Sequence, residues 1–144
     1  MSGPSSNPDR WPRRLPVEQL RIARPTDRLG EVERFYRVGV GLVEIDRFDD
    51  HGGYSGVMLG LPGASYHLEF TTHVDGSPGA APSRENLLVL YFGSVADAQE
   101  VADRLVGLGH DPVAAENPYW EESGAITFED PDGWRVVLVP APVY

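Results

Sequence analysis

The sequence predicts an α+β fold in which two β-α-β-β-β modules form an open, cup-shaped mixed sheet with the helices outside. Short segments alternate between apolar and polar residues, as half-buried strands do. One amphipathic helical segment occurs in each half of the 144-residue chain, and the order of elements repeats after a stretch rich in glycine and proline. We therefore divide the chain into a flexible N-terminal tail at residues 1–16, a first module at 17–74, a linker at 75–84 and a second module at 85–144.

The first half begins with a predicted strand at residues 18–24, whose sequence EQLRIAR alternates polar and apolar side chains until Pro25 ends it. Asp27 is expected to cap the helix that follows. The apolar stripe of this helix recurs at helical spacing and contains Leu29, Val32, Phe35 and Tyr36. Three further strands are expected at 42–48, 54–61 and 65–72, because turn-forming residues separate three alternating segments.

The second half repeats this order. A strand is predicted at 86–92, and Ser94 is expected to cap a helix that ends near Gly107 and Gly109. A weak extended segment at 112–115 and strands at 124–130 and 134–140 complete the module. The last two strands are joined by the turn Asp130-Pro131-Asp132-Gly133.

The tail contains four prolines and little apolar periodicity, so it is not expected to form a packed structure. Trp11 is its exception. This residue either has no structural role, or it pins the tail onto the domain or onto a second subunit.

Composition excludes several chemistries. The chain has no cysteine, which removes thiolate metal sites and thiol nucleophiles, and its 12 basic residues are all arginine, which removes the phosphate-binding lysine of P-loop proteins. A formal charge of −10 argues against nucleic acid as a partner. No apolar stretch is long enough to span a membrane, and no signal peptide is recognisable. We expect a cytoplasmic protein with a small-molecule ligand.

Three sequence features, taken with the repeated modules, resemble the vicinal oxygen chelate superfamily. They are the Phe35-Tyr36-Arg37 helix end, the His67-Leu68-Glu69-Phe70 strand and the segment from Phe128 to Trp134. This superfamily includes glyoxalase I, extradiol dioxygenases, fosfomycin-resistance proteins and bleomycin-binding proteins. The resemblance covers residues 18–140 and implies that the cup holds the ligand.

In the metal-dependent members a divalent ion (Zn, Ni, Fe or Mn) sits in the cup on four strand residues. The resemblance carries these positions onto Gln19, Glu69, Asn86 and Val137, which are 50 and 51 residues apart in the two modules. Valine cannot ligate, and amide oxygens are weak ligands for these metals, which prefer imidazole and carboxylate. We therefore expect no cofactor and no catalytic metal.

Strand alternation places a polar set of side chains on the inner face of the cup. The set contains Gln19 and Arg21 from the first strand, His67, Glu69 and Thr71 from the fourth, Asn86 with Leu88 and Leu90 from the fifth, and Arg135 with Val137 from the last. Two interpretations stay open. Arg21 or Arg135 forms an internal ion pair with Glu69, or the arginines bind a polar or anionic molecule. If one arginine pairs with Glu69, the other lacks a partner in the cup and is expected to recruit an anion. Trp134 is expected to face the helices.

Two pairs of residues are further candidates. His67 and Glu69 lie two apart on one strand, so they share a face and can act in acid-base chemistry, in metal binding or in a purely structural hydrogen bond. Tyr119 and Trp120 precede the seventh strand, where they can stack on a planar ligand or serve as a hydrophobic plug or dimer contact.

These observations lead to a hypothesis and one alternative. The chain is expected to be a glyoxalase/bleomycin-resistance-like homodimer that binds a small planar or anionic molecule in the cup without a catalytic metal. The alternative is a metal-dependent lyase, transferase or dioxygenase that uses His67 and Glu69 together with ligands from a partner subunit.

Overall fold

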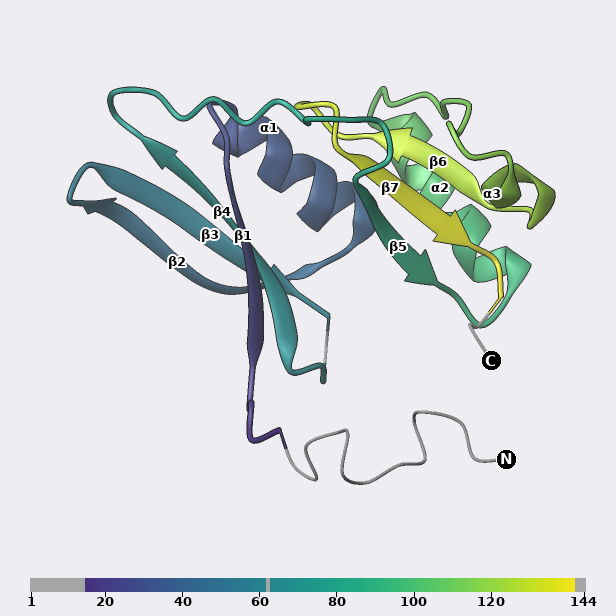
Figure 1. The fold of residues 1–144 in the computed structure, drawn as a ribbon, viewed down its shortest axis with the longest axis horizontal. Helices are drawn as coiled ribbons and strands as arrows, with labels where there is room; N and C mark the ends of the chain where they lie inside the picture. The colour runs from purple at the N-terminus through teal and green to yellow at the C-terminus, as the bar shows by residue number, and fades with distance from the viewer. Residues whose placement is uncertain (1–14, 62, 142–144) are drawn as a thin grey trace, which may run out of the picture.

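The computed structural model describes residues 15–61 and 63–141 (Figure 1). Trp11 and nearly all of the tail expected at 1–16 lie outside these residues. The first module contains β1 (Leu20–Pro25), α1 (Leu29–Glu33), the π-helical segment η2 (Arg34–Val40), β2 (Val43–His51), β3 (Tyr54–Gly60) and β4 (Tyr66–His73). The second contains β5 (Leu87–Tyr91), α2 (Val95–Gly107), α3 (Tyr119–Glu122), β6 (Ile126–Glu129) and β7 (Arg135–Val139).

The strands form two mixed sheets, in the orders β1-β4-β3-β2 and β5-β7-β6. In each sheet the first strand of the module pairs in parallel with the last, and the other pairings are antiparallel. The second module's counterpart of β2 is a single bridge between Val113 and Thr127, as the weak extended signal at 112–115 predicted. The α+β class and the repeated module are confirmed.

One hydrophobic core joins the two modules. It contains Val32, Phe35 and Tyr36 from the helical segments of the first module, Val101 and Leu105 from α2, and strand residues from both sheets, among them Phe70 and Val136. Figure 1 shows the helix of the first module lying between the two sheets. Each sheet therefore turns one face towards the shared core and the opposite face away from it. The two sheets are separate within one chain, which the sequence did not decide.

The helix termini differ from expectation in the first module only. Asp27 does not cap α1, because its carboxylate instead accepts a hydrogen bond from the backbone N–H of Ser77. The backbone N–H of Arg28 is bound by the Thr26 hydroxyl, 2.9 Å away. In the second module Ser94 caps α2 as predicted, with its hydroxyl accepting from the N–H of Asp97 at 3.1 Å.

The turn between β6 and β7 is organised by Asp130. Its backbone pairs with Trp134 and Gly133, and one carboxylate oxygen accepts hydrogen bonds from the N–H groups of Asp132 (2.8 Å) and Trp134 (3.0 Å). Gly133 adopts a φ of 89°, a left-handed conformation that glycine accepts without strain. The second carboxylate oxygen of Asp130 is left free to reach the first module.

Candidate functional site

The first polar cluster lies on the face of the β1-β4-β3-β2 sheet that points away from the core. Parallel pairing sets Arg21 opposite His67 and Ala23 opposite Glu69. The Nε–H of Arg21 donates to Nε2 of His67 over 2.9 Å, and its Nη1 lies 3.4 Å from a Glu69 carboxylate oxygen. The predicted proximity of these three residues is confirmed, and Arg21 is the arginine that pairs with Glu69.

The hydrogen bond from Arg21 fixes the state of the His67 ring. A guanidinium only donates, so Nε2 of His67 must be the acceptor and the ring proton must sit on Nδ1. His67 is buried, and its Nδ1 has no hydrogen-bond partner within residues 15–61 and 63–141. In this arrangement Nε2 of His67 is occupied by the hydrogen bond from Arg21 and is not open to a ligand.

The second polar cluster lies on the outward face of the β5-β7-β6 sheet. Arg135 is 4% exposed, and its Nε and Nη2 lie 3.1 Å and 3.0 Å from the same carboxylate oxygen of Glu129. Its Nη1 donates to the carbonyl of Ala114 over 2.8 Å. The expectation that Arg135 competes for Glu69 or lacks a partner is wrong, because antiparallel pairing sets it opposite Glu129 on β6.

Tyr119 and Trp120 form the short helix α3 and pack edge to face, with ring centroids 5.1 Å apart. Trp120 packs on the outward face of β7, against a small apolar cluster that contains Val137 and Val139. It also lines a cleft of about 230 Å³ with Arg84, Leu87, Thr127 and Arg135. Trp120 thus lies on the outward face of this sheet, whereas Tyr119 is exposed.

Asn86 is not on the face that alternation predicted. The pairing of β5 with β7 sets Leu87 opposite Arg135 and Val89 opposite Val137, so Asn86, Leu88 and Leu90 turn to the opposite face. Leu88 and Leu90 pack against the shared core. A shift of one residue exchanges the two faces of a strand. The spacing from Asn86 to Val137 is 51 residues, one more than the 50 from Gln19 to Glu69, and this difference of one residue is the shift.

The four positions that the family resemblance assigns to a metal do not fit one. Gln19 is exposed just before β1, Asn86 faces away from Val137, and Glu69 is already paired with Arg21. No cluster of three or more His, Asp or Glu side chains that could hold a metal ion occurs among the described residues. These four positions therefore support no chemical step through a metal.

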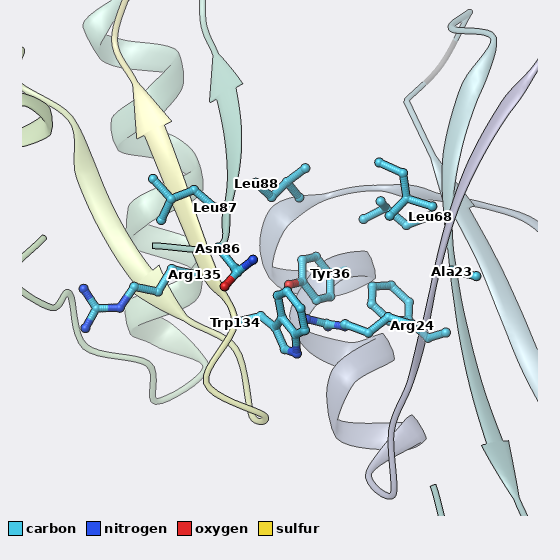
Figure 2. A pocket seen from close by; sticks show the side chains of 11 residues that line it. Ala23, Arg24, Tyr36, Leu68, Asn86, Leu87, Leu88, Trp134 and Arg135 are labelled. Carbon is cyan, nitrogen blue, oxygen red and sulfur yellow. The ribbon is translucent and has the colours of Figure 1, made fainter. Parts of the chain in front are cut away.

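A second cleft, also of about 230 Å³, opens between β1 and β5 on the core side of both strands. Figure 2 shows Arg24 and Trp134 approaching each other in front of Tyr36, while Arg135 points away from this cleft. The Arg24 guanidinium lies 4.7 Å from the Trp134 ring centroid and 4.9 Å from that of Phe70. Trp134 thus lies on the helix side of the sheet, as predicted.

Arg24 is a residue of this cleft that the sequence patterns did not single out. One of its Nη nitrogens lies 2.6 Å from a carboxylate oxygen of Asp130, which also accepts a hydrogen bond from the Tyr36 hydroxyl over 2.7 Å. The available signal was its position, since Arg24 follows Leu20 and Ile22 on the apolar face of β1. A charged residue on such a face must find a partner.

The Tyr36 hydroxyl stays protonated far into the alkaline range. Burial raises its pKa well above the usual value near 10, because the phenolate would lose its hydration, and the adjacent Asp130 carboxylate raises the pKa further. Tyr36 therefore acts as a donor that holds Asp130 and is not poised as a base.

Within the part of the chain that the structure describes, no helix combines the length and apolar character required to cross a membrane.

Family models match both halves of the chain. Residues 20–71 match the YycE-like N-terminal domain, and residues 85–140 match the YycE-like C-terminal domain. The chain is 47% identical over 121 residues to the uncharacterised protein YycE of Bacillus subtilis strain 168, covering 84% of this chain and 86% of that one.

Solved structures agree with this assignment. A YycE protein of unknown function from Bacillus subtilis, provisionally classed with glyoxalase and fosfomycin resistance proteins, superposes with a TM-score of 0.83 and 44% identity, over 88% of this chain and 92% of that one. TnmS3, an antibiotic binding protein from Streptomyces sp. CB03234, has a TM-score of 0.62 at 19% identity, over 89% of this chain and 100% of its own, and so shares the fold.

Proposed function

The chain belongs to the YycE-like family, within the vicinal oxygen chelate superfamily, and from that membership we propose that it binds a small planar or anionic molecule without a catalytic metal. One observation carries the proposal. Glu69, the single carboxylate at the four inherited metal positions, is engaged by Arg21 at 3.4 Å. A carboxylate that already neutralises a guanidinium is a poor ligand for a transition metal, whereas the same pair presents polar groups to an organic molecule.

We propose that the protein works as a homodimer. β1 and β5 are edge strands of their sheets, and edge strands carry unpaired backbone groups that natural proteins cover. Leu20 and Ile22 on β1 are 55% and 56% exposed, although they lie on the core side of the sheet. A second copy that covers β1 and β5 would bury this apolar surface in a closed two-fold arrangement.

The same dimer would complete the cup. Within one chain, the Arg21 cluster and the Arg135 cluster lie on sheet faces that both point away from a core shared by the two sheets. If β1 of one subunit lies beside β5 of its partner, the two outward faces become neighbours. We propose that each cup takes the Arg21 cluster from one subunit and the Arg135 cluster from the other.

Two measurements test the proposal. Elemental analysis of the protein purified without chelator should give well under one transition metal per chain, and a stoichiometric metal would favour a metal-dependent lyase, transferase or dioxygenase instead. A thermal-shift screen of planar and anionic compounds should contain members that raise the melting temperature, because a ligand of the folded state stabilises it by mass action. A screen in which no compound does so would contradict the binding role.

A further inference from the structure

We infer that the cup selects an uncharged planar ring with a hydrogen-bonding group, and that the cleft under α3 holds it between Trp120 and Thr127. This inference rests on the proposed binding function and narrows it to one of its two ligand classes. The evidence is the apolar lining of the cleft, the pairing of its charges and one buried hydroxyl group without a partner among the described residues.

Part of the cleft is lined by apolar side chains that suit a flat molecule. Trp120 contributes an indole ring, and Leu87 and Val137 contribute aliphatic surface from β5 and β7. All three are close in space, because they belong to or pack against the same apolar cluster on the outward face of the sheet. Aromatic rings offer a large, rigid and apolar contact surface, so this part of the cleft favours a planar ring over a flexible chain.

The charges around the cleft are already neutralised. Arg135 is bound by Glu129 and by the Ala114 carbonyl, and Arg84 pairs with Glu116, with 3.1 Å between a guanidinium nitrogen and a carboxylate oxygen. Glu85 adds a further negative charge to the lining. An anion entering the cleft would meet paired arginines and an excess of carboxylate.

The charges of the Arg21 cluster on the β1-β4-β3-β2 sheet are also paired. Arg21 is shared between Glu69 and His67, so it contributes no unpaired positive charge to a cup formed with the partner. The chain as a whole carries a formal charge of −10, which further disfavours an anionic ligand. The pairing of the charges therefore favours a neutral planar ligand over an anionic one.

Thr127 supplies the hydrogen-bonding group. It lines the cleft, is 3% exposed, and its hydroxyl has no hydrogen-bond partner among the described residues. The hydroxyl oxygen is itself buried. Rotation about the Cα–Cβ bond by one staggered step would exchange the positions of the methyl and hydroxyl groups and so change which of them a ligand meets. Because a hydroxyl both donates and accepts, a ligand carbonyl or amide could bind it and satisfy a group that is otherwise left unpaired.

Benzamide and benzoate test the inference directly, since they share a ring and a size and differ in charge. Binding of each is measured by titration of the full-length protein labelled with ¹⁵N, followed at the indole N–H of Trp120, which a Trp120→Phe variant assigns. We expect benzamide to shift this signal and to bind at least about tenfold more tightly than benzoate. Thr127→Val should weaken benzamide about fivefold, in the range for one lost hydrogen bond.

Stability provides the control. Thr127→Val removes an unpaired buried hydroxyl, so the variant should melt at or above the temperature of the unchanged protein, and weaker binding cannot then be attributed to unfolding. Thr72→Val on β4, outside this cleft, should leave benzamide binding unchanged.

Three outcomes would overturn the inference. If benzoate binds as tightly as benzamide, charge pairing does not select the ligand, and the proposed binding function survives without this refinement. If benzamide binds but Thr127→Val has no effect or the Trp120 signal does not move, the ring lies elsewhere. If neither compound binds and the wider screen also finds none, both the inference and the proposed function fail.

Discussion

Arg24 and Asp130 form an ion pair of 2.6 Å that joins the two modules, with side chains only 12% and 0% exposed. Arg24 comes from β1 and Asp130 from the turn between β6 and β7, 106 positions later in the sequence. The same carboxylate accepts from the Tyr36 hydroxyl and from two N–H groups of its own turn. One buried negative charge therefore links the two modules in addition to their shared hydrophobic core.

Asp130→Asn should lower the free energy of unfolding by about 3–5 kcal/mol, because it leaves the Arg24 guanidinium buried without its counter-charge. The asparagine oxygen can still accept from the N–H groups of the turn, so the loss reports the ion pair together with the Tyr36 hydrogen bond, which uses the same carboxylate oxygen. Urea denaturation measures it. When Arg24→Met is added to the Asp130→Asn variant, it should lower the free energy of unfolding by less than it does in the unchanged protein, because both residues take part in one interaction. Strict additivity would show that the two side chains are not coupled.

Tyr36 should make the protein less stable as the pH rises above about 10. Its pKa is raised in the folded state, so the unfolded chain releases the tyrosine proton first and alkaline pH favours unfolding. The free energy of unfolding should then fall by up to about 1.4 kcal/mol per pH unit between the two pKa values. Cysteine and lysine are absent, which leaves tyrosine as the ordinary side chain that titrates there.

Urea unfolding between pH 9 and 11 measures this slope. The Tyr36→Phe variant should show a smaller slope over the same range, whatever its stability at neutral pH. Equal slopes in the two proteins would mean that the hydroxyl of Tyr36 is not protected by burial beside Asp130.

Glu69→Gln should leave the fold intact and change ligand binding. Its ion pair with Arg21 is partly exposed, and such pairs contribute only about 0–1 kcal/mol to stability, so the melting temperature should move by a few degrees at most. Loss of the carboxylate frees the Arg21 guanidinium, and the variant should therefore gain affinity for anionic compounds relative to neutral ones. The measurement is a thermal-shift comparison of the two proteins. Glu31→Gln on α1 is the matched control.

One result would contradict the predicted change in preference from neutral towards anionic compounds. If Glu69→Gln binds every neutral and anionic compound as the unchanged protein does, Glu69 does not face the ligand and its assignment to the cup is wrong.

Ile22→Glu should convert the proposed dimer into a monomer. The side chain is half exposed on an edge strand, and a carboxylate at a buried subunit contact would have to be desolvated without a partner. Sedimentation velocity at micromolar concentration measures the change. Val95→Glu, at an exposed position on α2, should leave the dimer unchanged. A monomer for the unchanged protein would refute the dimer itself.

Local sequence patterns were enough to predict the fold class and most elements. Alternating segments, two helical stripes and turn residues are local signals, so they predicted the repeated module, the Ser94 cap and the turn at Asp130. Alternation also placed Arg21, His67 and Glu69 on one face of their strands, although it did not decide which arginine pairs with Glu69.

The face of β5 and the partners of the arginines could be known only from how the chain folds in three dimensions. The face of β5 depends on a pairing register that one residue reverses, which put Asn86 on the wrong side. Arg135 lies opposite Glu129, and Arg24 meets Asp130, a residue remote in sequence, through the docking of the two modules. These contacts join segments that no local pattern links, because side-chain partners are set by how the sheets pack around their shared core.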